Sequence, residues 1–232
     1  MVYQWLKNAQ IFPPRCLLCA GPGADGLDLC PGCRQDLPVN TTACCHCATP
    51  LTLGGKRCGR CQAHPPPFQA TVAPFLYAPP LDWLIWEAKF HGQLPAARLL
   101  GQLLAETLAA RETPLPQVIV PVPLHPTRLR ERGFNQALEV ARPVARSLGL
   151  PVTVEAVARV RATLPQSGQD RTSRRRNLRG AFSASGPLPW RQVAILDDVI
   201  TTTATVTELA ITLHKAGVEE IQVWCCARTG DD

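Results

Sequence analysis

Short apolar runs alternate with amphipathic stretches along most of the chain. Short runs of aliphatic and β-branched residues are typical of buried strands, whereas apolar residues spaced three or four positions apart predict helices. We therefore expect strands at Val118–Pro123, Val152–Val160, Val193–Leu196 and Ile221–Ala227, and helices at Leu81–Phe90, Ala96–Ala110, Asn135–Leu148 and Glu208–Ala216. This alternation predicts an α/β domain with a mainly parallel sheet.

The expected helix Leu81–Phe90 carries three aromatic side chains at helical spacing. Trp83, Trp86 and Phe90 would lie along one face. We interpret this stripe as part of the hydrophobic core rather than as a ligand platform, because large apolar side chains usually pack inside. Asp82 is the expected N-cap of this helix.

Two adjacent acids stand where an apolar run stops near the C-terminus. Asp197 and Asp198 follow the expected strand Val193–Leu196, and four threonines occupy the five positions from Thr201 to Thr205. Successive strand residues point to opposite faces, so we expect the strand to end before both acids. Ligands of open α/β sheets bind beyond the carboxyl ends of strands, and helix N-termini favour phosphate. The stretch therefore predicts a sugar-phosphate site, in which the acids accept hydrogen bonds from sugar hydroxyls or approach Mg²⁺.

The composition is that of a globular protein. The chain has 232 residues, 46% of them hydrophobic, which favours one or two domains. No run approaches the roughly 20 apolar residues of a membrane span, and the N-terminus lacks the pattern of a signal peptide. We therefore expect a cytoplasmic protein that is not an integral membrane protein. The proline-rich segment Ala63–Ala70 is the expected boundary between a domain at 1–66 and a domain at 67–232.

The net charge of +6 is concentrated in one part of the chain. Residues 121–180 hold 12 Arg against 4 Asp or Glu, a surplus of +8, so the rest of the chain sums to −2. Such a region attracts polyanions or phosphorylated ligands, although a solvated face is the alternative. Within it, Arg161–Gly180 lacks apolar periodicity, which indicates a long loop that serves as a lid or binding segment, or plain disorder.

Eight of the eleven cysteines form a duplicated C-x2-C-x10-C-x2-C pattern with a period of 28 residues. The two sets are Cys16, Cys19, Cys30 and Cys33, and Cys44, Cys47, Cys58 and Cys61. Tetrahedral Zn²⁺ needs four thiolates, so we expect two structural zinc ions, with a single zinc as the alternative. Pairing within each repeat is the simplest arrangement, and a cross-braced one also fits the spacing. Cys45, Cys225 and Cys226 lie outside the pattern. His46 and His64 could substitute as ligands, but we interpret them as surface residues beside the cysteine pairs.

Several stretches together resemble one known family. PVPLHPTRLRERGFNQA (Pro121–Ala137), LPQSGQDRTSRRRNLRGAF (Leu164–Phe182), AKFHG around Lys89 and ILDDVITTTAT are similar, in their order and spacing, to the ComF family of competence-associated phosphoribosyltransferase-like proteins. ILDDVITTTAT also resembles the loop of type I phosphoribosyltransferases that binds phosphoribosyl pyrophosphate (PRPP). The resemblance implies a type I phosphoribosyltransferase-like, mainly parallel sheet flanked by helices and preceded by a small double zinc-ribbon module.

The resemblance also implies roles for individual residues. Asp197 and Asp198 would hold the ribose hydroxyls as the catalytic acids, with Mg²⁺ accompanying PRPP. The residues implied at the 5′-phosphate and pyrophosphate are Thr201, Thr202, Thr203, Ala204, Thr205, Val122, Pro123, Arg128 and Arg132. Residues 161–180 would form a flexible flap, and the flap residues implied at nucleic acid are Arg171, Arg174, Arg175 and Arg176.

The function implied by the resemblance is the handling of single-stranded DNA during natural transformation, at the inner face of the membrane and beside other DNA-uptake proteins. One alternative is a metabolic phosphoribosyltransferase that salvages a nucleobase, although no base-recognition hood stands out in the sequence. Another is a non-catalytic zinc and nucleic-acid adaptor with a vestigial sugar-phosphate site. Thr203 occupies a position where the family pattern has glycine. Either the local φ is negative, or phosphate binding is weakened.

Overall fold

The computed structural model describes residues 13–52, 55–162 and 178–230. Its contacts divide the chain into two compact units, Met1–Leu37 and Pro38–Asp232. Each unit therefore contains one of the two cysteine sets. The folding boundary expected at residue 66 stays a prediction.

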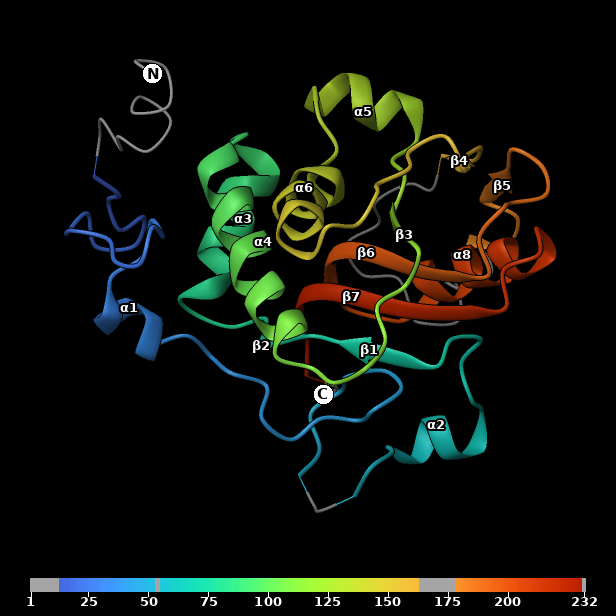
Figure 1. The fold of residues 1–232 in the computed structure, drawn as a ribbon, viewed down its shortest axis with the longest axis horizontal. Helices are drawn as coiled ribbons and strands as arrows, with labels where there is room; N and C mark the ends of the chain where they lie inside the picture. The colour runs from blue at the N-terminus through green and yellow to red at the C-terminus, as the bar shows by residue number, and fades with distance from the viewer. Residues whose placement is uncertain (1–12, 53–54, 163–177, 231–232) are drawn as a thin grey trace, which may run out of the picture. The chain divides into compact units, whose positions relative to one another are not determined.

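A parallel sheet forms the centre of the larger unit (Figure 1). Its strands are β1 (Ala70–Val72), β2 (Phe75–Leu76), β3 (Val118–Pro121), β6 (Gln192–Ile200) and β7 (Glu220–Arg228). The strand order is β1-β7-β6-β3, β2 also pairs with β7, and all of these pairings are parallel. The side chains at the centre of β6 and β7 are almost fully buried, including Cys225 and Cys226. The expected buried strand Ile221–Ala227 is thereby confirmed.

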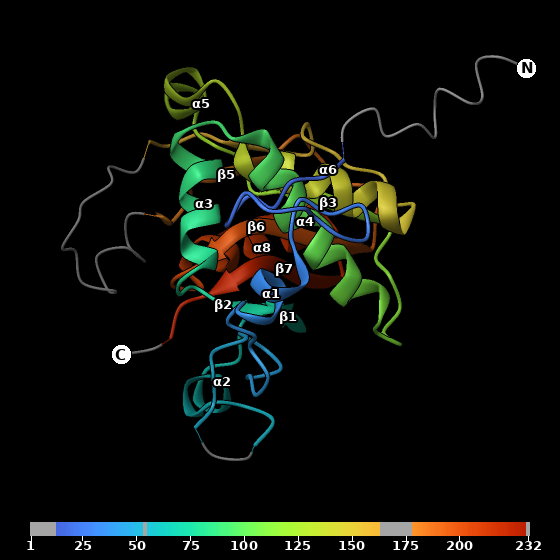
Figure 2. The ribbon, with the colours of Figure 1, turned by 90° about the vertical axis from the view of Figure 1, so that its left-hand side faces the viewer.

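Five helices in the larger unit are α3 (Leu81–Phe90), α4 (Leu94–Ala109), α5 (Pro126–Arg132), α6 (Gln136–Leu148) and α8 (Ala204–Lys215). Helices α4 and α6 pack against each other and against the sheet (Figures 1 and 2). Two further short helices, α1 (Pro31–Gln35) and α2 (Gly59–Ala63), each follow a cysteine. The helices expected at Leu81–Phe90, Ala96–Ala110 and Asn135–Leu148 are confirmed within two residues at each end. Asn135 is the N-cap of α6.

The aromatic stripe of α3 is not part of the core, so our interpretation of it was wrong. Trp83, Trp86 and Phe90 are 45%, 44% and 60% exposed. The face of α3 that packs inward consists of Leu81, Leu84, Ile85 and Ala88, all nearly fully buried. These aliphatic residues already fill a complete helical stripe, and the aromatic residues therefore lie outside it. The N-cap is Pro80 rather than Asp82, whose carboxylate accepts a hydrogen bond from the Trp83 N–H at 2.7 Å.

The strand expected at Val152–Val160 is also wrong in extent. Val152 makes a single parallel bridge to Ile119 at the edge of the main sheet, and the chain then bends over residues 154–156. Only β4 (Val157–Arg159) is a strand, and it pairs antiparallel with β5 (Phe182–Ala184) in a separate small sheet. From Val157 onward the chain therefore pairs with β5 and not with the edge of the parallel sheet.

Candidate functional site

The eight paired cysteines form two clusters, one in each unit. The first contains Cys16, Cys19, Cys30 and Cys33, the second Cys44, Cys47, Cys58 and Cys61, and within each cluster the sulfurs lie within 4.8 Å of one another. The pairing is therefore within each repeat and not cross-braced. Among the described residues, Cys45, His46 and His64 belong to neither cluster.

The backbone geometry repeats with the same 28-residue period as the cysteines. Ala20 and Ala48 both adopt a positive φ, 61° and 54°, which is uncommon for residues other than glycine. The short helices α1 and α2 begin directly after Cys30 and Cys58. Equivalent turns with the same unusual backbone conformation indicate that both segments are shaped around the same ligand.

The sulfur positions fit zinc. The Sγ atoms of Cys19 and Cys30 are 3.7 Å apart, and those of Cys47 and Cys58 are 3.6 Å apart. Zn–S bonds of about 2.3 Å in a tetrahedron place neighbouring sulfurs roughly 3.8 Å apart. Each cluster therefore has the donor atoms and the spacing that one tetrahedral zinc ion requires.

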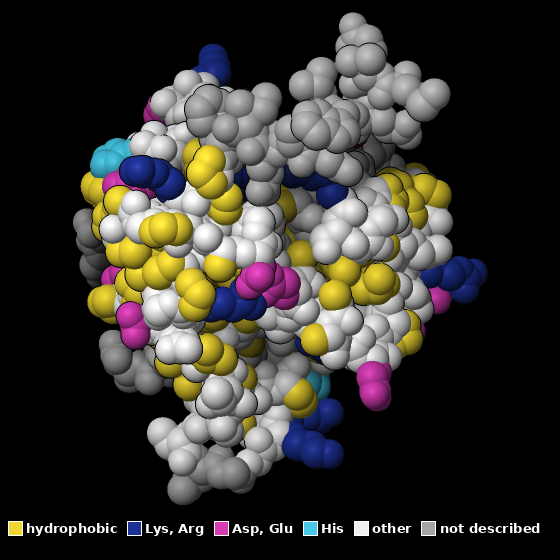
Figure 3. Space-filling model, turned by 60° about the vertical axis from the view of Figure 1, so that its left-hand side comes forward, with side chains coloured by type: hydrophobic (Ala, Val, Ile, Leu, Met, Phe, Trp, Pro, Cys, Tyr) yellow, Lys and Arg dark blue, Asp and Glu magenta, His cyan; other side chains and the backbone are white. Residues whose placement is uncertain are grey.

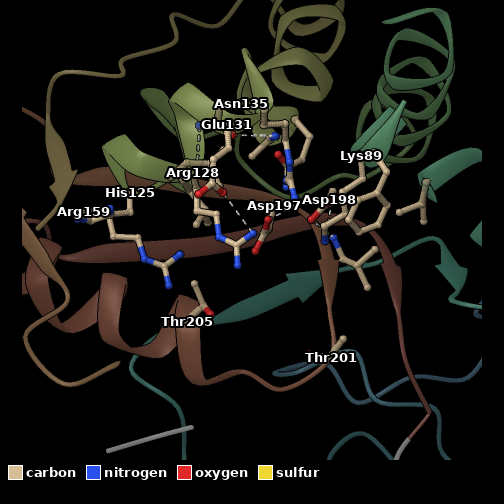
Figure 4. A pocket seen from close by; sticks show the side chains of 18 of the residues that line it. Lys89, His125, Arg128, Glu131, Asn135, Arg159, Asp197, Asp198, Thr201 and Thr205 are labelled. Carbon is tan, nitrogen blue, oxygen red and sulfur yellow. Dashed lines mark hydrogen bonds and ion pairs between the residues drawn. The ribbon is translucent and has the colours of Figure 1, made fainter. Parts of the chain in front are cut away.

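A cavity of about 720 Å³ opens along β6 in the larger unit (Figure 4). It is lined by parts of α3, α5, α6, β4 and β6. The expected site residues that it brings together are Asp197, Asp198, Thr201, Thr205, Val122, Arg128 and Arg132. Thr202, Thr203 and Ala204 instead line a second cavity of about 340 Å³, next to Cys47 and Cys61, and Pro123 lines neither.

The two acids lie inside β6 rather than after it, so the expected end of the strand at Leu196 was wrong. The last residue of β3, Pro121, pairs with Leu196, and the Val122 N–H donates to the Leu196 carbonyl at 2.8 Å. Strand β7 stays paired with β6 as far as Ile200. Beyond Leu196, one edge of β6 therefore has no β3 partner, and this edge opens to the cavity.

The negative charge of Asp197 and Asp198 is only partly compensated by a nearby cation. Asp198 is 5% exposed, and its Oδ2 lies 3.3 Å from Lys89 Nζ, which α3 supplies. Burial, and then the neighbouring Asp198 charge, raise the pKa of Asp197 well above its usual value. The Asp197 Oδ1 also accepts a hydrogen bond from the Asp198 N–H at 2.9 Å. The site therefore favours one carboxylate charge over two until a cation or a hydrogen-bond donor joins it.

Basic side chains approach the same cavity. Arg128 from α5 and Arg159 from β4 extend toward the side of Asp197 and Thr205 (Figure 4). Burial lowers the pKa of Arg132 and of Arg159, although arginine stays charged at neutral pH. Carboxylates and guanidinium groups thus face one space, which suits a ligand that carries both hydroxyls and phosphates.

The turn after β6 leads directly into α8, which begins at Ala204 rather than at the expected Glu208. Thr203 is the N-cap, with a φ of −74°, and its side chain makes no capping hydrogen bond. Of the two explanations for threonine in place of glycine at this position, the structure supports a negative φ, which threonine adopts without strain. The first N–H groups of α8 are not capped by the Thr203 hydroxyl.

Three residues of this region were not assigned a role from the sequence. Lys89 was noticed only as part of AKFHG, and Gln136 as part of the GFNQA stretch. Gln136 is 6% exposed and lines the cavity, and its Oε1 has no hydrogen-bond partner among the described residues. The third is Arg228, at the end of β7. A charged residue at the end of an apolar strand was the signal available for it.

Arg228 connects the second cysteine cluster to the turn after β6. Its side chain is fully buried. Nε donates to the Cys47 carbonyl at 3.1 Å and Nη2 to the Thr49 hydroxyl at 2.8 Å. Nη1 donates to the carbonyls of Ile200 at 3.2 Å and Thr201 at 2.8 Å. One guanidinium group therefore fixes the cysteine turn and the start of the threonine-rich turn to each other.

Comparison with known proteins identifies the family. A family model described as a double zinc ribbon domain matches residues 9–62. The DNA utilization protein YhgH of Escherichia coli (strain K12) is 41% identical over 222 residues, which cover 94% of this chain and 98% of that protein. Competence protein F of Haemophilus influenzae is 37% identical over 224 residues, which cover 92% and 96%. The chain belongs to the ComF family.

Solved structures overlap partly with this ComF-family chain. Glutamine PRPP amidotransferase from B. subtilis aligns with a TM-score of 0.41 and 19% identity, over 61% of this chain and 30% of that one. Purine phosphoribosyltransferase from Pyrococcus horikoshii aligns with a TM-score of 0.31 and 19% identity, over 60% and 84%. The mainly parallel sheet with flanking helices and the preceding zinc-ribbon module expected for a ComF protein are confirmed.

Two further expectations concern membrane-spanning helices and the arginines of the flap. Within the described ranges, no helix has both the length and the apolar character needed to cross a membrane. The flap residues Arg171, Arg174, Arg175 and Arg176 lie outside the described residues.

Proposed function

We propose that the cavity along β6 binds the ribose 5-phosphate part of PRPP. The observation that carries this proposal is that Asp197, Asp198 and Thr205 line one cavity together with Arg128 and Arg132. The two acids would accept hydrogen bonds from the ribose hydroxyls. The Thr205 hydroxyl and the first N–H groups of α8 would bind the 5′-phosphate, and the arginines would bind the pyrophosphate.

Mg²⁺ would reach this site together with the ligand. Among the described residues, only the cysteine clusters bring three or more candidate metal-binding side chains together. The acid pair alone is therefore an incomplete Mg²⁺ site, and phosphate oxygens of PRPP would supply the missing ligands. When bound, the ion would offset the second carboxylate charge that burial disfavours at Asp197.

We further propose that the two cysteine clusters each hold a structural zinc ion, and that the protein acts on single-stranded DNA during DNA uptake. The names of the relatives, a DNA utilization protein and a competence protein, support this role. The surplus of +8 in residues 121–180 supports contact with the phosphate backbone. The proposed location is the cytoplasm, at the inner face of the membrane, with DNA-uptake proteins as partners.

The salt dependence of DNA binding tests this part of the proposal. We expect affinity for single-stranded DNA to fall as salt rises, because bound phosphates release counterions. Replacing Arg174, Arg175 and Arg176 with Ala should lower the slope of log affinity against log salt by roughly 2, at about 0.7 for each phosphate contact. Arg191→Ala, outside the basic region, serves as the control. An affinity that is the same at low and physiological salt would contradict DNA binding through this region.

A further inference from the structure

Helix α3 presents its aromatic residues to the outside of the larger unit. Trp83, Trp86 and Phe90 are spaced three and four residues apart and are all about half exposed. At a rise of about 1.5 Å per residue, this aromatic face extends for roughly 10 Å along the helix. A space-filling view shows exposed apolar side chains next to Lys and Arg side chains on one face of the molecule (Figure 3). Clustered exposed aromatic residues usually mark a binding surface.

The aromatic face leads into the cavity along β6. Trp86 and Phe90 line the cavity, whereas Trp83 lies outside it. The rings of Trp86 and Phe90 are 6.2 Å apart, and the guanidinium group of Arg132 lies 5.5 Å from the centre of the Phe90 ring. The aromatic face therefore ends beside a cation that we have placed at the pyrophosphate.

A buried acceptor inside the cavity points to the chemistry of the occupant. The Gln136 Oε1 has no hydrogen-bond partner in the described parts of the chain, and a buried oxygen of this kind needs a donor. The amino group of a nucleobase or a sugar hydroxyl would supply it. Lys89 and Arg128 line the same cavity beside their ion-pair partners Asp198 and Glu131. Arg132 and Arg159 line it as well, and the guanidinium groups complement a phosphate backbone.

We propose that Trp83, Trp86 and Phe90 form a stacking platform for the bases of single-stranded DNA, along which a strand enters the cavity. Aromatic side chains stack with any base, and neighbouring arginines bind the phosphates, so the platform would be indifferent to sequence. This inference rests on the proposed function and deepens it, because it assigns the DNA contacts to α3. It also gives this chain a base-binding surface that the sequence did not reveal.

Binding of a labelled oligothymidylate, measured by fluorescence anisotropy, tests the platform. The double variant Trp86→Leu/Phe90→Leu keeps apolar side chains but removes the rings, and it should bind at least about tenfold more weakly, given 1–3 kcal/mol for each stacked base. Trp83→Leu, outside the cavity, should weaken binding in the same direction. Trp86→Phe keeps an aromatic ring at this position and should bind within about threefold of the wild type. Val154→Ala removes an exposed apolar side chain elsewhere in the larger unit and should bind as the wild type does.

The outcomes separate the platform from the proposed function. If the wild type binds the oligonucleotide and the leucine variants bind equally well, the platform is overturned and the proposed function stands. If the leucine variants change only the oligomeric state on size-exclusion chromatography, the face is a protein interface and the platform is likewise overturned. If the folded wild type binds neither the oligonucleotide nor PRPP, the proposed function itself fails. Circular dichroism of each variant confirms that the comparison is made between folded proteins.

Discussion

Two carboxylates lie side by side in β6, with Lys89 as a nearby cation. Burial and the Asp198 charge both disfavour ionisation of Asp197 and raise its pKa. A group whose pKa is raised by folding destabilises the folded protein at any pH at which it would be charged in the unfolded chain. The acid pair therefore has an energetic cost in the ligand-free protein, and ligand binding is the natural reason for its presence.

This cost predicts a pH-dependent stability change for Asp197→Asn. At neutral pH the variant should unfold at a higher temperature than the wild type, because asparagine requires neither a buried charge nor a bound proton in the folded state. As the pH falls towards about 4, where an ordinary aspartate takes up its proton, the difference should disappear. Calorimetry across this range measures it, and Glu112→Gln, which changes an exposed acid, should show no such trend. A variant that is less stable at neutral pH would contradict the raised pKa.

Only some residues of the site could be identified from the sequence. The acids and threonines were identified because they interrupt an apolar pattern. Lys89 and Arg228 were missed because their roles depend on contacts with distant parts of the chain, such as Lys89 of α3 with Asp198 of β6. Gln136 was missed because only the fold places it, buried, against the cavity. The register of β3 with β6 decides that the acids lie within the strand, and no local pattern reports this register.

At the scale of elements, β7 and the turn after β6 are held together by Arg228. The buried carbonyl groups of Ile200 and Cys47 and the partly buried carbonyl group of Thr201 all accept hydrogen bonds from this one side chain. The position of the threonine-rich turn therefore depends on the second cysteine cluster. Local sequence predicted α3, α4 and α6 within two residues at each end, but it placed the start of α8 four residues too late, did not predict α5, and assigned the wrong face of α3 to the core. The choice of face depended on the aliphatic stripe that meets α4.

Arg228→Lys tests this connection. Lysine retains the charge but cannot donate to both the cysteine turn and the turn after β6, so buried or partly buried carbonyl groups would lose their partners. We expect the free energy of unfolding, measured by urea denaturation, to fall by about 3 kcal/mol or more. Arg191→Lys is the matched control, since Arg191 is exposed and its change should cost less than about 0.5 kcal/mol. An equal loss of unfolding free energy in both variants would contradict the connecting role of Arg228.

At the scale of the whole molecule, the chain consists of two units with one cysteine cluster each. The duplication was readable from spacing alone because zinc imposes a fixed ligand geometry. The spacing could not show that the second cluster shares its compact unit with the parallel sheet, because this depends on contacts such as those of Arg228 with Cys47 and Thr49. Short segments such as 16–61 have little core of their own, so we expect metal to contribute to their folding.

Elemental analysis of protein purified without added metal checks the metal content. We expect two zinc ions per chain, falling to one in Cys19→Ser and to one in Cys58→Ser, since each variant removes a ligand from one cluster. Cys45→Ser should retain both ions, because the exposed Cys45 belongs to neither cluster. A zinc content near zero, or loss of metal in Cys45→Ser, would contradict the assignment.

The central claim is that PRPP binds along β6, and calorimetric titration with PRPP and ribose 5-phosphate, with and without Mg²⁺, tests it most directly. The account predicts saturable binding of PRPP that Mg²⁺ strengthens. Asp198→Asn removes a charged acceptor while keeping its shape, and it should weaken binding by roughly one to two decades. Glu112→Gln should bind as the wild type does. Absence of binding by the folded wild type, or an Asp198→Asn variant with unchanged affinity, would contradict the account.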